Sequence, residues 1–191
     1  VATTGSGYNA AALVGQVPSG YTLTMTDCRN AADVVTGDEN AGGLVAWVDD
    51  DRNSGLVMER CGNTGNIASS YNAGGLRGYF GGGSLRIADC FNTGSVTCDF
   101  GSGGVLGQVP DNYSAGDSLL IANCYSTGAV AITSTNTAEI GGIVGLNTAS
   151  DGVLKISNCY YSSTTTPTTN GAKDDGAIAK TSDEFGSGEV A

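Results

Sequence analysis

The sequence predicts an all-β protein, a parallel β-helix (β-solenoid) of about five coils with a short C-terminal capping helix. The first observation is a nine-residue motif, centred on a cysteine, that recurs at Cys28, Cys61, Cys90, Cys124 and Cys159. These cysteines are 33, 29, 34 and 35 residues apart, a spacing typical of solenoids, propellers or helical arrays. The second is a local apolar period of two, the period of a β-strand. The third is glycine, 31 of 191 residues, which punctuates every run.

The segment before each cysteine is the clearest predicted strand. Three residues before the cysteines stand Met25, Met58, Ile87, Ile121 and Ile156, and five residues before them stand Leu23, Leu56, Leu85, Leu119 and Leu154. Six residues after the first four cysteines come Val34, Ile67, Val96 and Val130. One coil cannot bury its own inner face, so equivalent positions should stack on those of neighbouring coils. We therefore expect four ladders along the axis, made of Leu, Ile or Met, Cys and Val.

A second predicted strand begins at a pair of small residues some 15 to 20 positions before each cysteine. It reads AALVGQV at 11–17, GGLVAWV at 42–48, GGLRGYF at 74–80, GGVLGQV at 103–109 and GGIVGLN at 141–147. Each repeat then offers about three short strands. That is too few for a propeller blade, and no window has the apolar i, i+3, i+4, i+7 spacing of a helical repeat. A propeller and a helical array are therefore both disfavoured.

A corner is predicted just before each cysteine, because the step from the residue three positions earlier breaks the alternation. The Asn-Thr-Gly after Cys61 and Cys90 predicts a sharp turn with left-handed backbone at Asn and Gly. We expect Asn63 and Asn92 to stack their amides between coils.

The chain divides into a five-coil solenoid at 1–163 and a Thr-rich loop with a C-terminal cap at 164–191. The stretch STTTPTTN at 163–170 is typical of a linker or an O-glycosylated loop. After it, Thr181 or Ser182 is the expected N-cap of a short helix with Asp183 and Glu184 in its first turn. Because the first residue is Val1, we expect the chain to be a fragment of a longer protein.

Composition excludes several classes of partner. The net charge is −11, and only eight Lys and Arg residues are present, without clustering, which argues against binding to nucleic acid. No stretch reaches the roughly 18 apolar residues that a membrane span needs, so we expect no membrane insertion. There is no histidine and no CxxC, so zinc spacing is absent. We expect the six cysteines to be buried, reduced thiols, with disulfides as the alternative. We expect Cys98 to lie off the ladder that the other five cysteines form.

The candidate binding surface consists of the loops between the two predicted strands, whose lengths vary most and which should share one edge of the rod. They lie at 17–22, 48–55, 80–84, 109–118 and 147–152. The candidate residues are Asp49, Asp50, Asp51, Asn53, Asp111, Tyr113, Asp117 and Asp151, with Tyr21 as a further aromatic. We expect no cofactor. Calcium on Asp49, Asp51 and Asn53 is the alternative, although the run lacks the Gly and Glu of an EF-hand loop.

An enzyme is not expected. A glycosidase needs two close carboxylates beside an aromatic groove, and the only tryptophan is Trp47, in a strand. Without histidine there is no HExxH and no Ser-His-Asp triad.

The two repeated signatures together resemble the GLUG repeat, named for Gly-Leu-any-Gly. The matching residues are Gly43-Leu44, Gly75-Leu76-Arg77-Gly78, Gly142-Ile143-Val144-Gly145 and the Asn-Cys-Tyr turns at 123–125 and 158–160. The resemblance covers residues 10 to about 163, with a degenerate first repeat. GLUG repeats occur in large bacterial surface and secreted proteins, including IgA-cleaving metallopeptidases, and the C-terminal segment resembles the helical tail that covers the final coil of such arrays.

The resemblance implies an extracellular or bacterial cell-surface location and a modular role. We expect a non-catalytic stalk, monomeric, whose loop edge serves as an adhesin surface for a host glycan or extracellular protein. The alternatives are an accessory, substrate-positioning domain of a secreted peptidase and, third, a carbohydrate-active β-helix.

Overall fold

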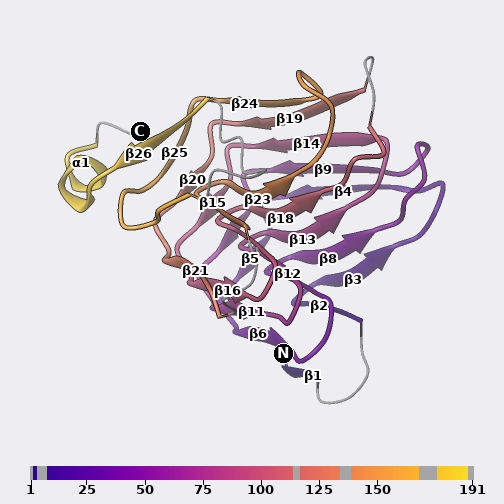
Figure 1. The fold of residues 1–191 in the computed structure, drawn as a ribbon, viewed down its shortest axis with the longest axis horizontal. Helices are drawn as coiled ribbons and strands as arrows, with labels where there is room; N and C mark the ends of the chain where they lie inside the picture. The colour runs from indigo at the N-terminus through magenta and orange to yellow at the C-terminus, as the bar shows by residue number, and fades with distance from the viewer. Residues whose placement is uncertain (1, 4–7, 114–116, 134–138, 168–175, 189–191) are drawn as a thin grey trace.

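Five parallel sheets build the fold, and the strands of each sheet lie one above another along a common axis (Figure 1). The computed structural model describes residues 2–3, 8–113, 117–133, 139–167 and 176–188. Sheet A contains β1 (Ala2–Thr3), β6 (Val34–Thr36), β11 (Ile67–Ala68), β16 (Val96–Cys98) and β21 (Val130–Ile132). Sheet B contains β2 (Asn9–Ala11), β7 (Asn40–Gly42), β12 (Asn72–Gly74), β17 (Gly101–Gly103) and β22 (Glu139–Gly141).

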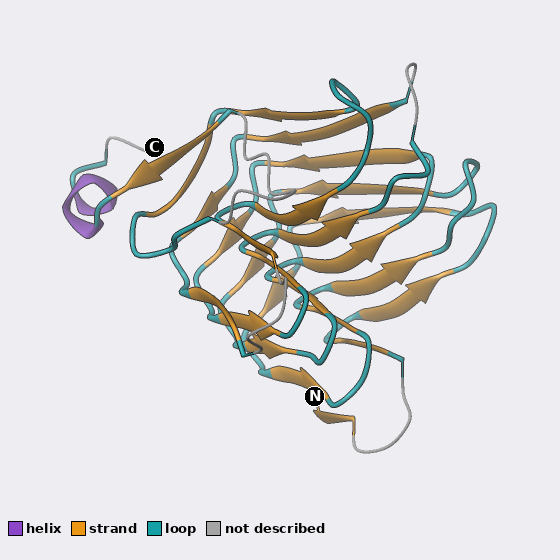
Figure 2. Cartoon of the chain, viewed as in Figure 1, coloured by secondary structure: helices purple, strands orange, loops and turns teal. Residues whose placement is uncertain are grey.

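The other three sheets continue the same course (Figure 2). Sheet C contains β3 (Val14–Val17), β8 (Val45–Val48), β13 (Arg77–Phe80), β18 (Leu106–Val109) and β23 (Val144–Asn147). Sheet D contains β4 (Thr22–Thr26), β9 (Gly55–Glu59), β14 (Ser84–Ala88), β19 (Ser118–Ala122) and β24 (Leu154–Ser157). Sheet E contains β5 (Arg29–Asn30), β10 (Gly62–Asn63), β15 (Phe91–Asn92), β20 (Tyr125–Ser126), β25 (Cys159–Ser162) and β26 (Ala177–Lys180).

The chain passes through sheets B, C, D, E and A in that order and then repeats. It does so completely four times, and a fifth described pass runs through B, C, D and E, so the predicted β-solenoid is confirmed with about four full turns. The expectation of three strands per repeat is wrong, because each complete coil has five. Strands of two or three residues in sheets A, B and E are too short to show an alternating pattern.

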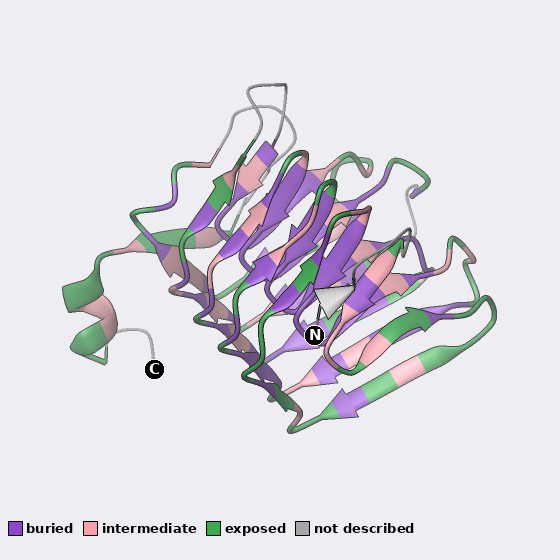
Figure 3. Cartoon of the chain, turned by 90° about the horizontal axis from the view of Figure 1, so that it is seen from below, coloured by how far each residue is buried: buried purple, intermediate pink, exposed green. Residues whose placement is uncertain are grey.

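The predicted apolar ladders are confirmed by the strand register. In sheet D, Leu85 pairs with Leu56 and Leu119, and Ile87 pairs with Met58 and Ile121. In sheet A, the valine position of each coil pairs with that of the next, at Val34, Ile67, Val96 and Val130. Buried residues accordingly run through successive coils (Figure 3). The larger core lies between sheets C, D and E, and a smaller one, which includes Cys98, lies between sheets A and B.

The corner before each cysteine is confirmed and has an unusual backbone. The residue directly before the cysteine has a positive φ of 50° to 56° in all five repeats, at Asp27, Arg60, Asp89, Asn123 and Asn158. This left-handed residue turns the chain from sheet D into sheet E. The prediction that the Asn-Thr-Gly segments use left-handed backbone is wrong, since positive φ occurs before the cysteine and not at these Asn or Gly residues.

Asn63 and Asn92 instead lie in strands and form the predicted amide stack. Asn30 Nδ2 donates to Asn63 Oδ1 at 2.8 Å, and Asn63 Nδ2 donates to Asn92 Oδ1 at 2.8 Å. Together with the backbone of the next coil, this ladder explains the second glycine of the pairs at Gly43 and Gly75. A Cβ on Gly75 would lie 2.3 Å from Asn92 Cγ, so only glycine lets the two segments approach.

One residue departs from the apolar pattern of sheet C. Arg77 is fully buried at a position where the neighbouring strands place Val45 and Leu106. Its guanidinium lies 4.4 Å from the centre of the Phe80 ring and donates to the carbonyl of Tyr79, while Nε and Nη1 have no partner among the described residues. Burial lowers the pKa of Arg77 to about 9.

Replacing Arg77 with leucine is expected to stabilise the fold. A buried, incompletely bonded charge is commonly less favourable than a packed apolar side chain, by about 1–3 kcal/mol. The measurement is the free energy of unfolding from urea titration of Arg77→Leu and the parent. A loss of stability would show that the cation–π contact outweighs desolvation.

The C-terminal segment forms the predicted short helix. The helix α1 (Ser182–Gly186) has Thr181 as its N-cap, with a capping box to Glu184. β26 pairs with β25 and so adds a sixth strand to sheet E. No residue of α1 is buried, and the ring of Phe185 lies 6.2 Å from that of Tyr125, on sheet E. No helix in the described residues is long and apolar enough to span a membrane.

Candidate functional site

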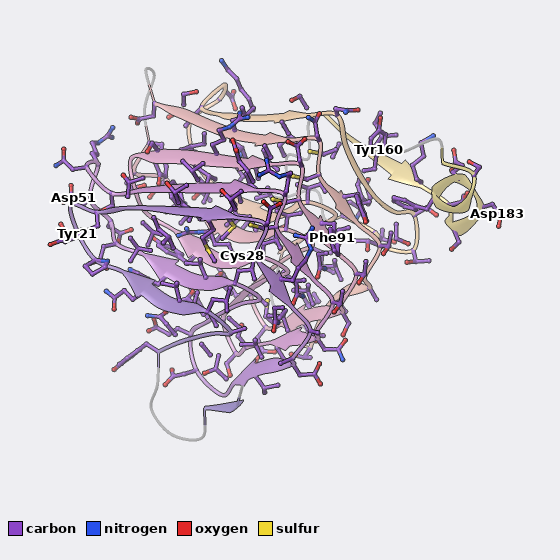
Figure 4. All side chains as sticks on the ribbon, turned by 180° about the vertical axis from the view of Figure 1, so that it is seen from behind. Tyr21, Cys28, Asp51, Phe91, Tyr160 and Asp183 are labelled. Carbon is purple, nitrogen blue, oxygen red and sulfur yellow. The ribbon has the colours of Figure 1, made fainter. Side chains whose placement is uncertain are left out.

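The variable loops all connect sheet C to sheet D and therefore lie along one edge of the stack, as predicted from their spacing. Figure 4 shows Tyr21 and Asp51 near one another on this edge, far from Phe91, Tyr160 and the helix that carries Asp183. We call this surface the loop edge and define it by loops 18–21, 49–54, 81–83, 110–117 and 148–153; residues 114–116 lie outside the described part of the chain.

The carboxylate of Asp49 joins the first and second coils. Its Oδ1 accepts hydrogen bonds from Gln16 Nε2 at 2.8 Å and from Trp47 Nε1 at 2.7 Å, and its Oδ2 accepts one from the backbone N–H of Ser19 at 3.0 Å. Asp49 therefore braces the coils and holds the indole of Trp47 in place.

Asp50 and Asp51 face different environments. Asp51 accepts hydrogen bonds from the Ser19 hydroxyl and from both nitrogens of Asn53, and these donors, led by Ser19, lower the pKa of its carboxyl. Asp50 accepts a hydrogen bond from the Tyr79 hydroxyl at 3.3 Å, and partial burial raises the pKa of its carboxyl. The carboxylate run is thus a set of structural acceptors with separate partners.

Arg52, in the loop of the second coil, reaches past the third coil to Asp117 in the loop of the fourth. Its Nη1 lies 2.7 Å from Asp117 Oδ2, and its Nη2 donates to the carbonyl of Asn112 at 2.7 Å. The third loop makes this reach feasible, because it consists of glycines alone: a Cβ on Gly83 would lie 1.9 Å from the Arg52 carbonyl oxygen. The second loop folds over the third.

Removing this link should loosen the loop edge without unfolding the stack. For Arg52→Ala we expect a loss of about 0.5–1 kcal/mol, because the pair is partly exposed and screened by salt. The measurement is urea unfolding of the variant and parent at low and high salt. If the difference between them does not shrink at high salt, the link is not electrostatic.

The remaining candidates do not gather into one site. Tyr113 is only 3% exposed, its ring stacks with Phe80 at 6.0 Å, and its hydroxyl donates to the carbonyls of Phe80 and Gly82. It is a core residue, so its ring does not present a surface to a ligand. Asp111 and Asp151 are exposed.

The geometry gives no support to the calcium interpretation of Asp49, Asp51 and Asn53. The carboxylates of Asp49 and Asp51 already accept hydrogen bonds from N–H or O–H groups, as described above. In the described part of the chain, no group of three or more His, Cys, Asp or Glu side chains is placed to hold a metal ion.

The cysteine ladder is a structural feature of the corner. All six cysteines are free thiols in this structure. Each ladder thiol donates to the carbonyl two residues before it, at 3.0 Å for Cys90 and 3.1 Å for Cys124. Cysteine therefore suits the corner because it is small and apolar and its thiol can donate to a carbonyl of the adjoining strand in sheet D. Burial raises the pKa of Cys61 to about 11.

Thiol titration tests this arrangement. In the denatured, unreduced protein we expect close to six free thiols. In the native protein at pH 8 we expect at most one to react, that of the half-buried Cys28, because the other five are buried and out of reach of the reagent. Two or fewer thiols in the denatured sample would show that disulfides link the coils.

Sequence reasoning missed a groove between sheets B and C. It has a volume of about 380 Å³, and its lining includes Trp47 and Tyr79, whose rings stack at 4.5 Å. The register pairs these residues with Gln16 and Gln108 in the adjacent coils. Because the residue type changes from coil to coil, no repeated pattern marks this position. Trp47 as the single tryptophan was the one available signal.

Comparison with known proteins adds no assignment. No family model, curated protein or solved structure matches the chain. The resemblance to GLUG repeats therefore stays a prediction that rests on the quoted glycine and cysteine motifs.

Proposed function

We propose that the chain is a non-catalytic β-solenoid module of a bacterial cell-surface or secreted protein, which acts as a stalk and binds an extracellular glycan or protein. The observation that supports this proposal best is the bonding of the loop-edge carboxylates. Asp49, Asp51 and Asp117 each accept hydrogen bonds from a neighbouring or more distant coil. Such links stiffen a rod, and they differ from the two close, opposed carboxylates that glycosidases use.

The experiment is a paired screen of the purified chain. Binding is measured on arrays of glycans and extracellular matrix proteins, and product release is measured on the arrayed polysaccharides as new reducing ends. We expect binding without product. Turnover would overturn the non-catalytic assignment, and no binding on either array would overturn the binding role.

A matched pair of variants tests whether the loop edge is the contact surface. Asp111→Asn removes an exposed carboxylate from the loop edge, and Asp183→Asn removes one from α1, at the opposite side (Figure 4). If the loop edge makes the contact, only Asp111→Asn changes binding.

A further inference from the structure

The groove between sheets B and C contains an interrupted ladder of amides. Asn40 Nδ2 donates to Asn9 Oδ1 at 2.9 Å, and Asn72 Nδ2 donates to Asn40 Oδ1 at 3.0 Å. The next strand places Gly101 opposite Asn72, so the ladder stops there. Asn72 is 1% exposed, lines the groove, and its Oδ1 accepts no hydrogen bond from the described residues. An unpaired buried acceptor is unfavourable, and a ligand that donates to it recovers this loss.

A second buried acceptor lies in the same groove. Gln108 Oε1 also lacks a partner among the described residues, and Gln108 pairs in register with Tyr79 of the preceding coil. Two buried acceptor oxygens on successive coils require a ligand with several donors. Hydroxyl groups meet this requirement, whereas phosphate and carboxylate groups would bring further acceptors.

Aromatic rings form rigid walls around these acceptors. Trp47 and Tyr79 in the lining stack at 4.5 Å, and Tyr71, also in the lining, stacks on Phe100 at 4.5 Å. The loop edge fixes the first pair, because Trp47 donates to Asp49 and Tyr79 donates to Asp50. Rigid aromatics supply contact area at low entropic cost.

The charge and the dimensions of the groove restrict the ligand further. Glu39 lies in the lining, and the chain carries a net charge of −11, so an acidic ligand would be repelled. Neighbouring coils are about 4.8 Å apart, which is comparable to the length of one sugar ring, so successive sugars can meet successive coils.

We propose that this groove binds a neutral, extended oligosaccharide whose hydroxyl groups donate to Asn72 Oδ1 and Gln108 Oε1 between the aromatic walls. The site is separate from the loop edge. The inference rests on the proposed function in taking a glycan as the ligand.

The test uses Trp47 as a reporter, since it is the only tryptophan in the chain. Titration with cellotetraose and with tetra-N-acetylchitotetraose, both neutral, should produce a saturable change in tryptophan emission for at least one of them. Two variants should weaken that binding about tenfold, the effect of losing one hydrogen bond to a buried acceptor. Gln108→Ala removes one acceptor. Gly101→Asn extends the amide ladder, so that the new side chain satisfies Asn72 Oδ1 and fills the space beside it.

Gly101→Asn also controls for misfolding. Gly101 does not have a positive φ, and the nearest atom to an added Cβ is the side-chain oxygen of Asn72, at 2.8 Å. The Asn72 amide has to shift slightly, and the Gly107 carbonyl oxygen lies 3.2 Å from the added Cβ, so we expect a melting temperature close to that of the parent, while the affinity falls. Ile178→Ala, at an exposed position of β26 in sheet E, should leave the affinity unchanged.

Three outcomes would overturn the proposal. One is no emission change with either oligosaccharide, and another is binding only of an acidic hyaluronan tetrasaccharide. The third is full affinity in both Gln108→Ala and Gly101→Asn. If array binding then falls in Asp111→Asn, the proposed function stands with its contact on the loop edge, and the groove assignment alone fails.

Discussion

Replacing Ile121 with aspartate is expected to unfold the stack. Ile121 is fully buried in β19, and the strands on either side place Ile87 and Ile156 against it. The aspartate would have no partner in this apolar ladder. Folding would therefore either bury its charge or require the carboxylate to take up a proton, and both are unfavourable. We expect a loss of about 4 kcal/mol or more. The measurement is the urea midpoint, followed by far-UV circular dichroism.

The neighbouring Leu120 provides a matched control. It lies in the same strand but is only half-buried, and its register partners are Arg86 and Lys155. Leu120→Asp therefore places an acid between two bases and should change stability by less than about 1 kcal/mol. Equal unfolding midpoints for Ile121→Asp and Leu120→Asp would mean that the register of sheet D is wrong.

Replacing Gly74 with alanine is the second substitution with a large expected effect. A Cβ at this position would lie 1.8 Å from the Arg77 carbonyl oxygen and 2.6 Å from the Gly107 nitrogen. Both are backbone atoms of sheet C, so relief requires sheets B and C to move apart. We expect a loss of about 3 kcal/mol or more in the free energy of unfolding.

Gly37→Ala is the control for loss of glycine as such. No atom lies within 4 Å of a Cβ at Gly37, which is exposed and has no positive φ. Its stability should change by less than about 1 kcal/mol. A Gly74→Ala protein as stable as Gly37→Ala would contradict the close packing of sheets B and C, and with it the explanation of the glycine pair.

The ladders of sheets A and D could be predicted because the same residue type recurs at the same offset in every coil. Leu56 and Leu85, for example, stack on one another, and both stand five residues before a cysteine. The left-handed corner was placed correctly, but its conformation was not predictable. Four of the five residues there are Asp or Asn, which adopt positive φ more often than other non-glycine residues but not often enough to predict it, and Arg60 breaks the pattern.

The loop edge was predicted from loop length, whereas its bonding was not. The partners of a loop residue come from other coils, as Ser19 does for Asp51 and Asp117 does for Arg52, and no local pattern marks such pairs. Tyr113 was assigned to the surface because it lies in a long polar loop, but its ring turns inward onto Phe80. The groove residues also differ between coils, so only coordinates place Trp47 beside Asn72.

The central claim is the in-register parallel stack, and one distance tests it most directly. Thr24 and Lys155 are far apart in the sequence, but both are exposed and they occupy the same column of paired positions in sheet D. They are separated by four strand spacings, or about 19 Å. The measurement is pulsed electron–electron double resonance between spin labels attached to non-natural amino acids at these two positions. A single narrow distribution near that distance is the predicted result, and a broad distribution centred well beyond about 30 Å would contradict the stack.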